Sequence, residues 1–285
     1  MKINNYICGA MKKIYLLYLL AIGLLLVGLP LLYCSIAAAD ESASDSTGNL
    51  TVAAKTTTKD TDGMTQATDD STAPLRQWKA GTVVTAEAVR AFGIDNCFQV
   101  EPISDALFAR MQGKSYPKGC TVPRSDLRHL KTLHVDKDGN IKLGEMVCNK
   151  AIAQDLKEIF RALYDNRYPI ERMVLIDEYN ANDDLSMRDN NSSCFCFRKV
   201  MGTQNLSKHA RGLAVDINTL YNPWVHTSNG KRKVDPATGA PYADRTKKFP
   251  YKIEQGDLCH RLFIAHGFRW GGAWRSSKDY QHFDK

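Results

Sequence analysis

A stretch of twelve residues, SKHARGLAVDIN at positions 207–218, carries much of the information about the fold and chemistry of this 285-residue chain. Its second half alternates along the chain, which predicts a short β-strand with three apolar residues on one face: Leu213, Val215 and Ile217. Asp216 then lies on the other face, where a carboxylate in an apolar strand is costly unless it is paired or metal-bound. An ion pair with Arg211 would satisfy this aspartate, and so would a metal site shared with His209.

A second stretch, WGGAWRSSKDYQHFD at positions 270–284, places Asp279 three residues before His282. A catalytic zinc site needs three nitrogen or oxygen ligands from the protein and one open position for water. His209, Asp216 and His282 would supply those ligands. Asp279 would then lie beside the metal as a general base, because zinc lowers the pKa of bound water toward about 7. Zinc is inferred from the ligand types, and another divalent ion could serve in its place.

Residues outside these two motifs predict a hairpin and two helices. HVDKDGNIKL (134–143) alternates around an Asp-Gly pair, which is typical of a β-hairpin. A calcium loop would need glycine where this chain has Ile141, so the turn is the better interpretation. Segments 151–169 and 259–268 have apolar residues at helical spacing, and the second is expected to end at Gly267.

Two further segments complete the predicted domain. MVLIDEY (173–179) is expected to form a short buried strand, and the polar, Gly- and Pro-bearing segment 225–250 a surface loop near the site. Helices mixed with hairpin-like strands predict a single α+β domain over residues 75–285, which is long enough for one sizeable core.

The N-terminal residues predict export. Lys12 and Lys13 precede an uncharged apolar run over 14–33, and an Ala-x-Ala site ends at Ala39. This is the pattern of a secretory signal peptide over residues 1–39. A retained membrane anchor is the alternative, because about 20 apolar residues can span a bilayer. Either reading puts the rest of the chain outside the cytoplasm.

Composition and charge describe the segment that follows. Residues 40–74 are rich in Thr, Ser, Asp and Ala, which predicts a flexible linker because such a segment buries too little apolar area to order itself. The net charge is +7, but three lysines belong to residues 1–39, so 35 basic and 31 acidic residues remain. This small surplus gives no indication of nucleic-acid binding, although a mild positive field could help hold the protein near anionic polymers.

The cysteine content leaves two interpretations open. Six cysteines follow the leader, and an exported domain with an even number could form three disulfides. Buried thiols are the other interpretation. The six are Cys97, Cys120, Cys148, Cys194, Cys196 and Cys259.

The two chemical motifs together resemble a known family. Ser207, His209, Gly212, Ala214 and Asp216 form the pattern S-x-H-x-x-G-x-A-x-D, which is similar to the zinc signature of the D-alanyl-D-alanine carboxypeptidase family. That family includes VanY-type carboxypeptidases and phage endolysins that cut L-alanyl-D-glutamate bonds. The resemblance extends over most of residues 95–285 and implies the hedgehog/DD-peptidase fold, with a central antiparallel sheet.

The resemblance also implies roles for particular residues. His209, Asp216 and His282 correspond to zinc ligands and Asp279 to the catalytic base, a position that holds Glu in the better-known members. Arg198 matches an arginine that stabilises the developing oxyanion. Three further residues are candidates for shaping the substrate pocket: Ser193, Asn191 and Asp184.

The implied function is hydrolysis of peptide bonds in bacterial peptidoglycan stem peptides, outside the cytoplasm. Both D-Ala-D-Ala carboxypeptidase and L-Ala-D-Glu endopeptidase activities need the same zinc core. The fold is also similar to the signalling domain of hedgehog proteins, so a zinc-stabilised cell-wall binding module without catalysis is the alternative. Asp279 and Arg198 favour the enzyme, because a purely structural zinc site has no use for a base.

Overall fold

The computed structural model describes residues 70–200 and 203–285. The expected leader over 1–39 and nearly all of the expected linker lie outside these residues. Within them, the first helix begins at Ala73, two residues before the expected start of the folded domain. In the described part of the chain, no helix is both long and apolar enough to cross a membrane.

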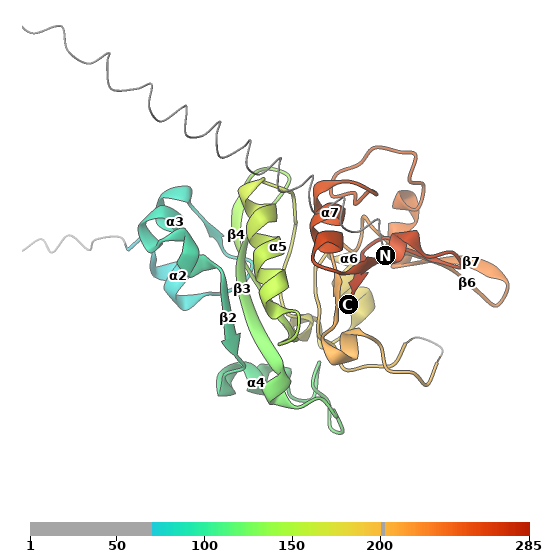
Figure 1. The fold of residues 1–285 in the computed structure, drawn as a ribbon, viewed down its shortest axis with the longest axis horizontal. Helices are drawn as coiled ribbons and strands as arrows, with labels where there is room; N and C mark the ends of the chain where they lie inside the picture. The colour runs from blue at the N-terminus through green and yellow to red at the C-terminus, as the bar shows by residue number, and fades with distance from the viewer. Residues whose placement is uncertain (1–69, 201–202) are drawn as a thin grey trace, which may run out of the picture. The chain divides into compact units, whose positions relative to one another are not determined.

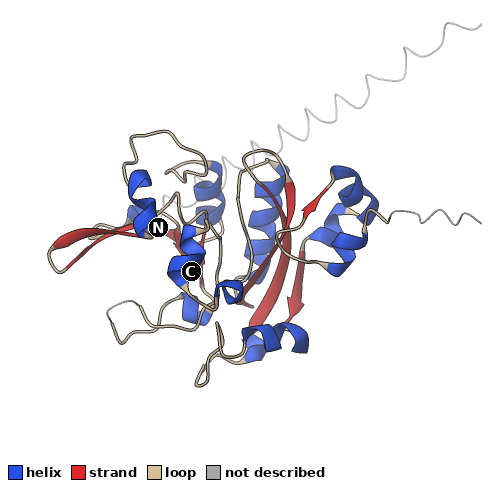
Figure 2. Cartoon of the chain, turned by 180° about the vertical axis from the view of Figure 1, so that it is seen from behind, coloured by secondary structure: helices blue, strands red, loops and turns tan. Residues whose placement is uncertain are grey.

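Helices and antiparallel strands alternate along the described chain, and this confirms the predicted α+β class (Figures 1 and 2). The α-helices are α2 (Ala73–Gln77), α3 (Ala86–Phe92), α4 (Asp105–Met111), α5 (Ala153–Asp165), α6 (Asp183–Arg188) and α7 (Leu258–Ala265). The strands are β1 (Val83–Val84), β2 (Gln99–Pro102), β3 (Leu127–Val135), β4 (Ile141–Asn149), β5 (Ala214–Asp216), β6 (Trp224–Ser228), β7 (Lys231–Asp235), β8 (Arg269–Trp270), β9 (Lys278–Asp279) and β10 (His282–Asp284). Six short 3-10 helices join them: η1 (Ile94–Cys97), η2 (Arg124–Asp126), η3 (Ile176–Tyr179), η4 (His209–Arg211), η5 (Ala237–Tyr242) and η6 (Gly271–Ala273).

The largest sheet has the order β1-β4-β3-β2 and is antiparallel throughout. Its centre is the predicted hairpin, in which β3 and β4 pair from Leu127 opposite Asn149 to Val135 opposite Ile141. Asp136 closes the turn by accepting hydrogen bonds from the backbone N–H groups of residues 138 and 140. Gly139 adopts φ +86°, a conformation that favours glycine. The hairpin prediction is therefore confirmed, and its Asp side chain orders the turn.

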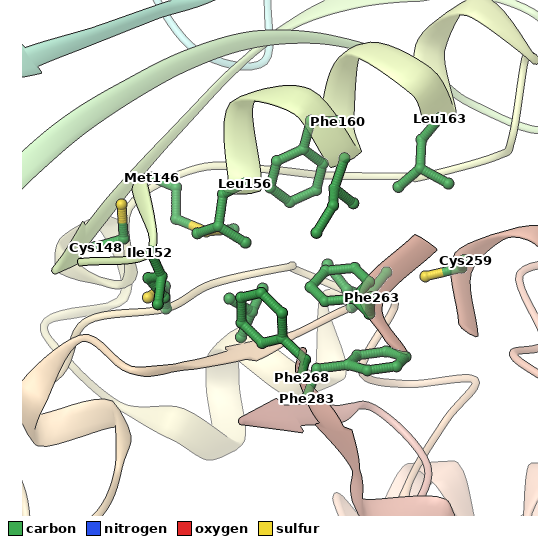
Figure 3. Packing of buried hydrophobic residues seen from close by; sticks show 14 of the residues in the cluster. Met146, Cys148, Ile152, Leu156, Phe160, Leu163, Cys259, Phe263, Phe268 and Phe283 are labelled. Atoms are coloured by element: carbon green, nitrogen blue, oxygen red, sulfur yellow. The ribbon is translucent and has the colours of Figure 1, made fainter. Parts of the chain in front are cut away.

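Helix α5 packs against this sheet because its apolar residues recur every three or four positions. Five of its side chains are buried: Ala153, Leu156, Ile159, Phe160 and Leu163. They meet Phe263 of α7 and Phe283 of β10 in one core, in which the Phe263 and Phe283 rings stack 4.2 Å apart (Figure 3). Burying side chains of this size contributes about 1.5–3 kcal/mol each. The core thus joins the large sheet to the strand that carries His282.

Two smaller sheets lie in the C-terminal part of the chain. One has the order β5-β10-β8 and the other β7-β6-β9. Leu213, Val215 and Ile217 face the core of α5 and α7, as the alternation predicted. Asp257 caps the start of helix α7, since its side chain accepts from the backbone N–H of His260, and the chain leaves the helix through Gly267 at φ +82°. Both predicted helices are confirmed.

The predicted strand over residues 173–179 is wrong, although the segment is buried as expected. Residues Ile176–Tyr179 form the 3-10 helix η3 instead. The Asn191 side chain bonds both the N–H and the C=O of Val174, at 2.9 and 3.0 Å, so these groups cannot pair with a neighbouring strand. At Val174 a side chain therefore takes the place of a neighbouring strand, while the carbonyl oxygen of Met173 accepts from the backbone N–H of Glu145 in β4.

The segment 225–250, predicted as a surface loop, contains regular secondary structure. Strands β6 and β7 form a β-hairpin that extends from the rest of the domain (Figure 1), and η5 follows it. The hairpin is attached through β6, where Trp224 pairs with Asp279 of β9. The expected position near the candidate site is therefore confirmed.

All six cysteines of the described residues are free thiols, so the three-disulfide interpretation is not borne out. Five are buried, and Cys148, Cys194 and Cys259 belong to the apolar core around α5. Burial raises the pKa of Cys148 to about 12, which keeps its thiol protonated. These cysteines act as small apolar side chains.

Candidate metal centre and active site

Three short elements bring His209, Asp216 and His282 together. His209 begins η4, Asp216 ends β5, and His282 begins β10 directly opposite Asp216. Gly212, at φ +66°, turns the chain from η4 into β5. A Cβ at this position would lie 2.7 Å from the backbone nitrogen of Asn149, so only glycine allows the close approach that sets the spacing of the motif.

One ligand atom from each of the three side chains lies within 4.8 Å of the others. His209 Nε2 lies 3.2 Å from His282 Nδ1 and 3.2 Å from Asp216 Oδ2, and His282 Nδ1 lies 3.1 Å from Asp216 Oδ1. Ligands at about 2.0–2.1 Å in a tetrahedral zinc site are separated by roughly 3.3 Å. The observed spacing therefore fits a small divalent cation held by three protein ligands.

The surroundings fix the orientation of these side chains. His209 and His282 are 4% and 8% exposed, and His209 Nδ1 lies 2.7 Å from the carbonyl oxygen of Cys194. A hydrogen bond at the second ring nitrogen leaves Nε2 free as a ligand atom, which is the usual arrangement for metal-binding histidines. The Arg211 side chain, the alternative partner of Asp216, is exposed and forms no ion pair with it.

The charge balance of the site also fits a cation. Burial acts to raise the pKa of Asp216, but His209 and His282 outweigh it and hold that pKa well below its usual range. Within the described residues, neither Asp216 nor Asp279 forms an ion pair with a lysine or arginine. Two partly buried carboxylates without a lysine or arginine partner are costly, and a divalent ion would balance them.

Asp279 ends the short strand β9, three residues before His282. Its Oδ1 is buried and has no hydrogen-bond partner. Burial raises the pKa of this carboxyl to about 7, with the charge of His282 opposing the rise and that of Asp216 adding to it. Gly271 allows the approach, since a Cβ there would lie 2.6 Å from the Asp279 carbonyl oxygen and 3.2 Å from the His282 Cβ. A buried, unpaired carboxylate of this kind is suited to accept a proton.

The four residues line one pocket of about 300 Å³. Ser193 and Arg198, both predicted from sequence, also line it. Ser193 pairs with Asp216 through two backbone hydrogen bonds, and Arg198 forms an ion pair with Asp183. This ion pair orients the guanidinium at the pocket wall, where it could donate to a substrate oxygen.

Asn191 and Asp184 do not line the pocket. Asn191 is fully buried, and its amide bonds Val174 and the Ser186 hydroxyl. Asp184 forms an ion pair with Arg188 on the outer side of α6. Its neighbour Asp183 is the residue that faces the pocket. The pocket also contains residues that the sequence interpretation missed, among them Trp224, Asp235, Trp274 and Gln281.

Two imidazoles and a carboxylate that converge in a pocket beside a second, unpaired carboxylate define the class of site found in metal-dependent hydrolases. Residues 201–285 match the family model described as D-alanyl-D-alanine carboxypeptidase. This segment contains His209, Asp216, Asp279 and His282, and the match confirms the resemblance predicted from the motifs. No curated protein and no solved structure matched the chain. The C-terminal segment therefore carries the pattern of a peptidase family whose members are zinc enzymes.

Proposed function

We propose that this chain is a zinc-dependent peptidase that hydrolyses peptide bonds in peptidoglycan stem peptides, as a D-Ala-D-Ala carboxypeptidase or an L-Ala-D-Glu endopeptidase. The observation that carries the proposal is the cluster of ligand atoms beside the free oxygen of Asp279. In this cluster the two imidazole nitrogens lie 3.2 Å apart, and each lies 3.1–3.2 Å from one oxygen of Asp216. The match of residues 201–285 to a carboxypeptidase family supports the substrate class.

His209, Asp216 and His282 would hold the zinc ion. When bound, zinc supplies Lewis-acid chemistry, which lowers the pKa of a water molecule and polarises a carbonyl group. Asp279 accepts a proton from the attacking water at Oδ1, and then returns this proton to the nitrogen of the leaving amine. A carboxylate beside the reacting water can perform both transfers.

Arg198 stabilises the negative charge that develops on the substrate carbonyl oxygen. Its ion pair with Asp183 fixes the guanidinium at the pocket wall before substrate binds. A donor already in place costs little reorganisation during the reaction. Ser193 lines the same wall and contributes to the shape of the pocket.

We further propose that the protein acts outside the cytoplasm, in the periplasm or cell envelope. The charge and apolar pattern of residues 1–39 supports export, and a retained segment would tether the domain to the membrane. Labelling a tagged chain in intact cells with a membrane-impermeant reagent tests this location. Protection of the C-terminal domain from the reagent would contradict it.

The activity is tested by incubating the full-length, zinc-loaded protein with intact peptidoglycan and identifying the products by mass spectrometry. Loss of a terminal alanine marks a carboxypeptidase, and release of whole stem peptides marks an endopeptidase. A chelator should abolish either product. A folded protein that holds one zinc ion and releases no product would refute the proposal and favour the binding module of the same fold.

A further inference from the structure

Unpaired buried polar atoms gather in the lining of the candidate active-site pocket. Five of them lie there in the described part of the chain: Arg198 Nε, Trp224 Nε1, Asp279 Oδ1, Gln281 Oε1 and Asp284 Oδ1. The side chains of Arg198 and Asp284 form ion pairs with Asp183 and Arg269. Native proteins leave few buried polar groups without a partner, because each one loses its hydrogen bonds to water. Asp279 has a role as the proposed base. The donor of Trp224 and the acceptor of Gln281 have no role in the chemistry described above.

Trp224 is held rigidly at the base of the β6–β7 hairpin. Its ring stacks on that of His226, with centroids 3.8 Å apart and planes 14° from parallel. His226 Nε2 lies 2.6 Å from Asp235 Oδ2, and Asp235 pairs with Trp224 across the hairpin. These contacts fix the plane of the indole but use none of its hydrogen-bonding capacity. The buried N–H therefore remains available to a ligand in the pocket.

Gln281 lies in the chain between the proposed base Asp279 and the proposed zinc ligand His282. It is only 3% exposed, and its backbone carbonyl accepts from the N–H of Ile217. Its side-chain nitrogen contacts the sulfur of Met187 at 3.6 Å, whereas Oε1 has no donor. A buried amide oxygen in a pocket wall is an acceptor for an N–H group of a ligand.

We propose that Trp224 and Gln281 form a subsite that binds the backbone of the substrate peptide. Trp224 Nε1–H donates to a substrate carbonyl or carboxylate oxygen, and Gln281 Oε1 accepts from a substrate amide N–H. A peptide unit offers this combination of one acceptor and one donor. The subsite rests on the proposed peptidase function, and it assigns the β6–β7 hairpin the task of holding the peptide beside Asp279.

The test is Trp224→Phe in the full-length, zinc-loaded protein, since phenylalanine keeps an aromatic ring against His226 and removes the N–H. With a soluble stem peptide that ends in D-Ala-D-Ala, or with the substrate identified from peptidoglycan, KM should rise about 5–10-fold. The kcat should stay within about 2-fold, because the bond is made in both the ground and transition states. Zinc content should not change.

Trp78→Phe is the matched control. Trp78 lies outside the pocket, and its indole N–H already donates to the carbonyl oxygen of Gly144 at 3.1 Å. Its replacement should change KM less than 2-fold. An equal effect of the two substitutions, or no effect of Trp224→Phe, would overturn the assignment of the Trp224 donor.

Gln281→Met removes the acceptor with little change in side-chain length, and it should also raise KM, again with unchanged zinc content. If KM is unchanged in this variant, Gln281 has no part in binding.

A binding measurement separates this subsite from the peptidase proposal. If the wild-type protein cleaves nothing, the peptidase proposal fails, and calorimetric titration of the zinc-loaded protein with the same stem peptide decides the subsite. Binding weakened about 5–10-fold by Trp224→Phe would support it. Equal binding by both proteins, or no binding by either, would overturn it.

Discussion

Two clusters of buried histidine and carboxylate side chains lie in this domain, and they differ in how their charge is balanced. In the first, Glu145 of β4 lies 2.9 Å from His129 and forms two hydrogen bonds with Arg110, the shorter at 2.6 Å. In the second, Asp216 lies between two imidazoles, and no lysine or arginine of the described residues pairs with it.

The first cluster is complete without a ligand. Burial acts to raise the pKa of Glu145, but the bonds from His129 and Arg110 outweigh it and lower that pKa. In the second cluster burial prevails at Asp279, whose pKa rises to about 7. Histidine and carboxylate side chains therefore form a structural network where an arginine balances the negative charge. They form a candidate binding site where the carboxylates face a pocket and have no arginine partner.

The largest expected effect comes from Asp279→Asn, which removes the proton acceptor and keeps the shape of the side chain. Turnover of peptidoglycan should fall by about 10²–10⁴-fold, the usual contribution of a general base. Bound zinc, measured by elemental analysis, should stay at one per chain. Near-normal turnover in this variant would remove Asp279 from its role as base.

Glu145→Gln is the matched control, since it makes the same chemical change in the complete cluster. This variant loses an ion pair with the partly exposed Arg110 and should be less stable. Turnover per folded molecule should remain near the wild-type value. A loss as large as that of Asp279→Asn would show that the two clusters do not differ in the proposed way.

Metal binding should distinguish the clusters next. Zinc that binds only the folded chain stabilises it, by about 4 kcal/mol at a concentration 1,000-fold above the dissociation constant. Denaturant unfolding with zinc and with a chelator measures this difference. His209→Ala should lose most of it, whereas His129→Ala, in the complete cluster, should keep it. Equal stabilisation of the two variants by zinc would place the metal elsewhere.

The sequence predicted the elements that depend on contacts between residues close together in the chain, and it failed where distant residues determine the backbone conformation. The β3–β4 hairpin and α5 were predicted because their apolar spacing and turn residues act within about ten positions. The segment 173–179 was not, because the Asn191 side chain, distant in sequence, occupies the backbone groups that a strand would use. Burial could be predicted there, but the form of the backbone could not.

The same limit applies to the site. His209 and Asp216 share one motif, and their donor atoms meet as predicted. On α6, Asp184 pairs with Arg188 one turn along the helix, while Asp183 faces the pocket. The orientation of the helix about its axis determines which of the two aspartates lines the pocket, and the sequence alone does not give this orientation. Trp224 lines the pocket because β6 pairs with β9, and no local sequence pattern predicts this pairing.

The smallest expected effect concerns a fourth buried histidine, His134 of β3. Within the described residues it has no carboxylate in ion-pair distance, and it lines no pocket described above. Its Nδ1 lies 2.8 Å from the carbonyl oxygen of Ile170. Burial lowers the pKa of His134 to about 4, the Ile170 carbonyl opposing this shift and the charge of Lys142 adding to it. The folded state therefore binds this proton more weakly than the unfolded state, whose pKa is about 6.5.

Because the folded pKa is the lower one, acid favours unfolding, and stability should be lost as the pH falls through the window from about 6.5 to 4. Between pH 7 and pH 5 the loss from His134 should be about 2 kcal/mol. Denaturant unfolding of the metal-free protein at both pH values measures it, with His134→Gln as the variant that cannot titrate. If wild type and variant lose the same free energy of unfolding between these pH values, the pKa of His134 is not lowered in the folded state and the prediction is wrong.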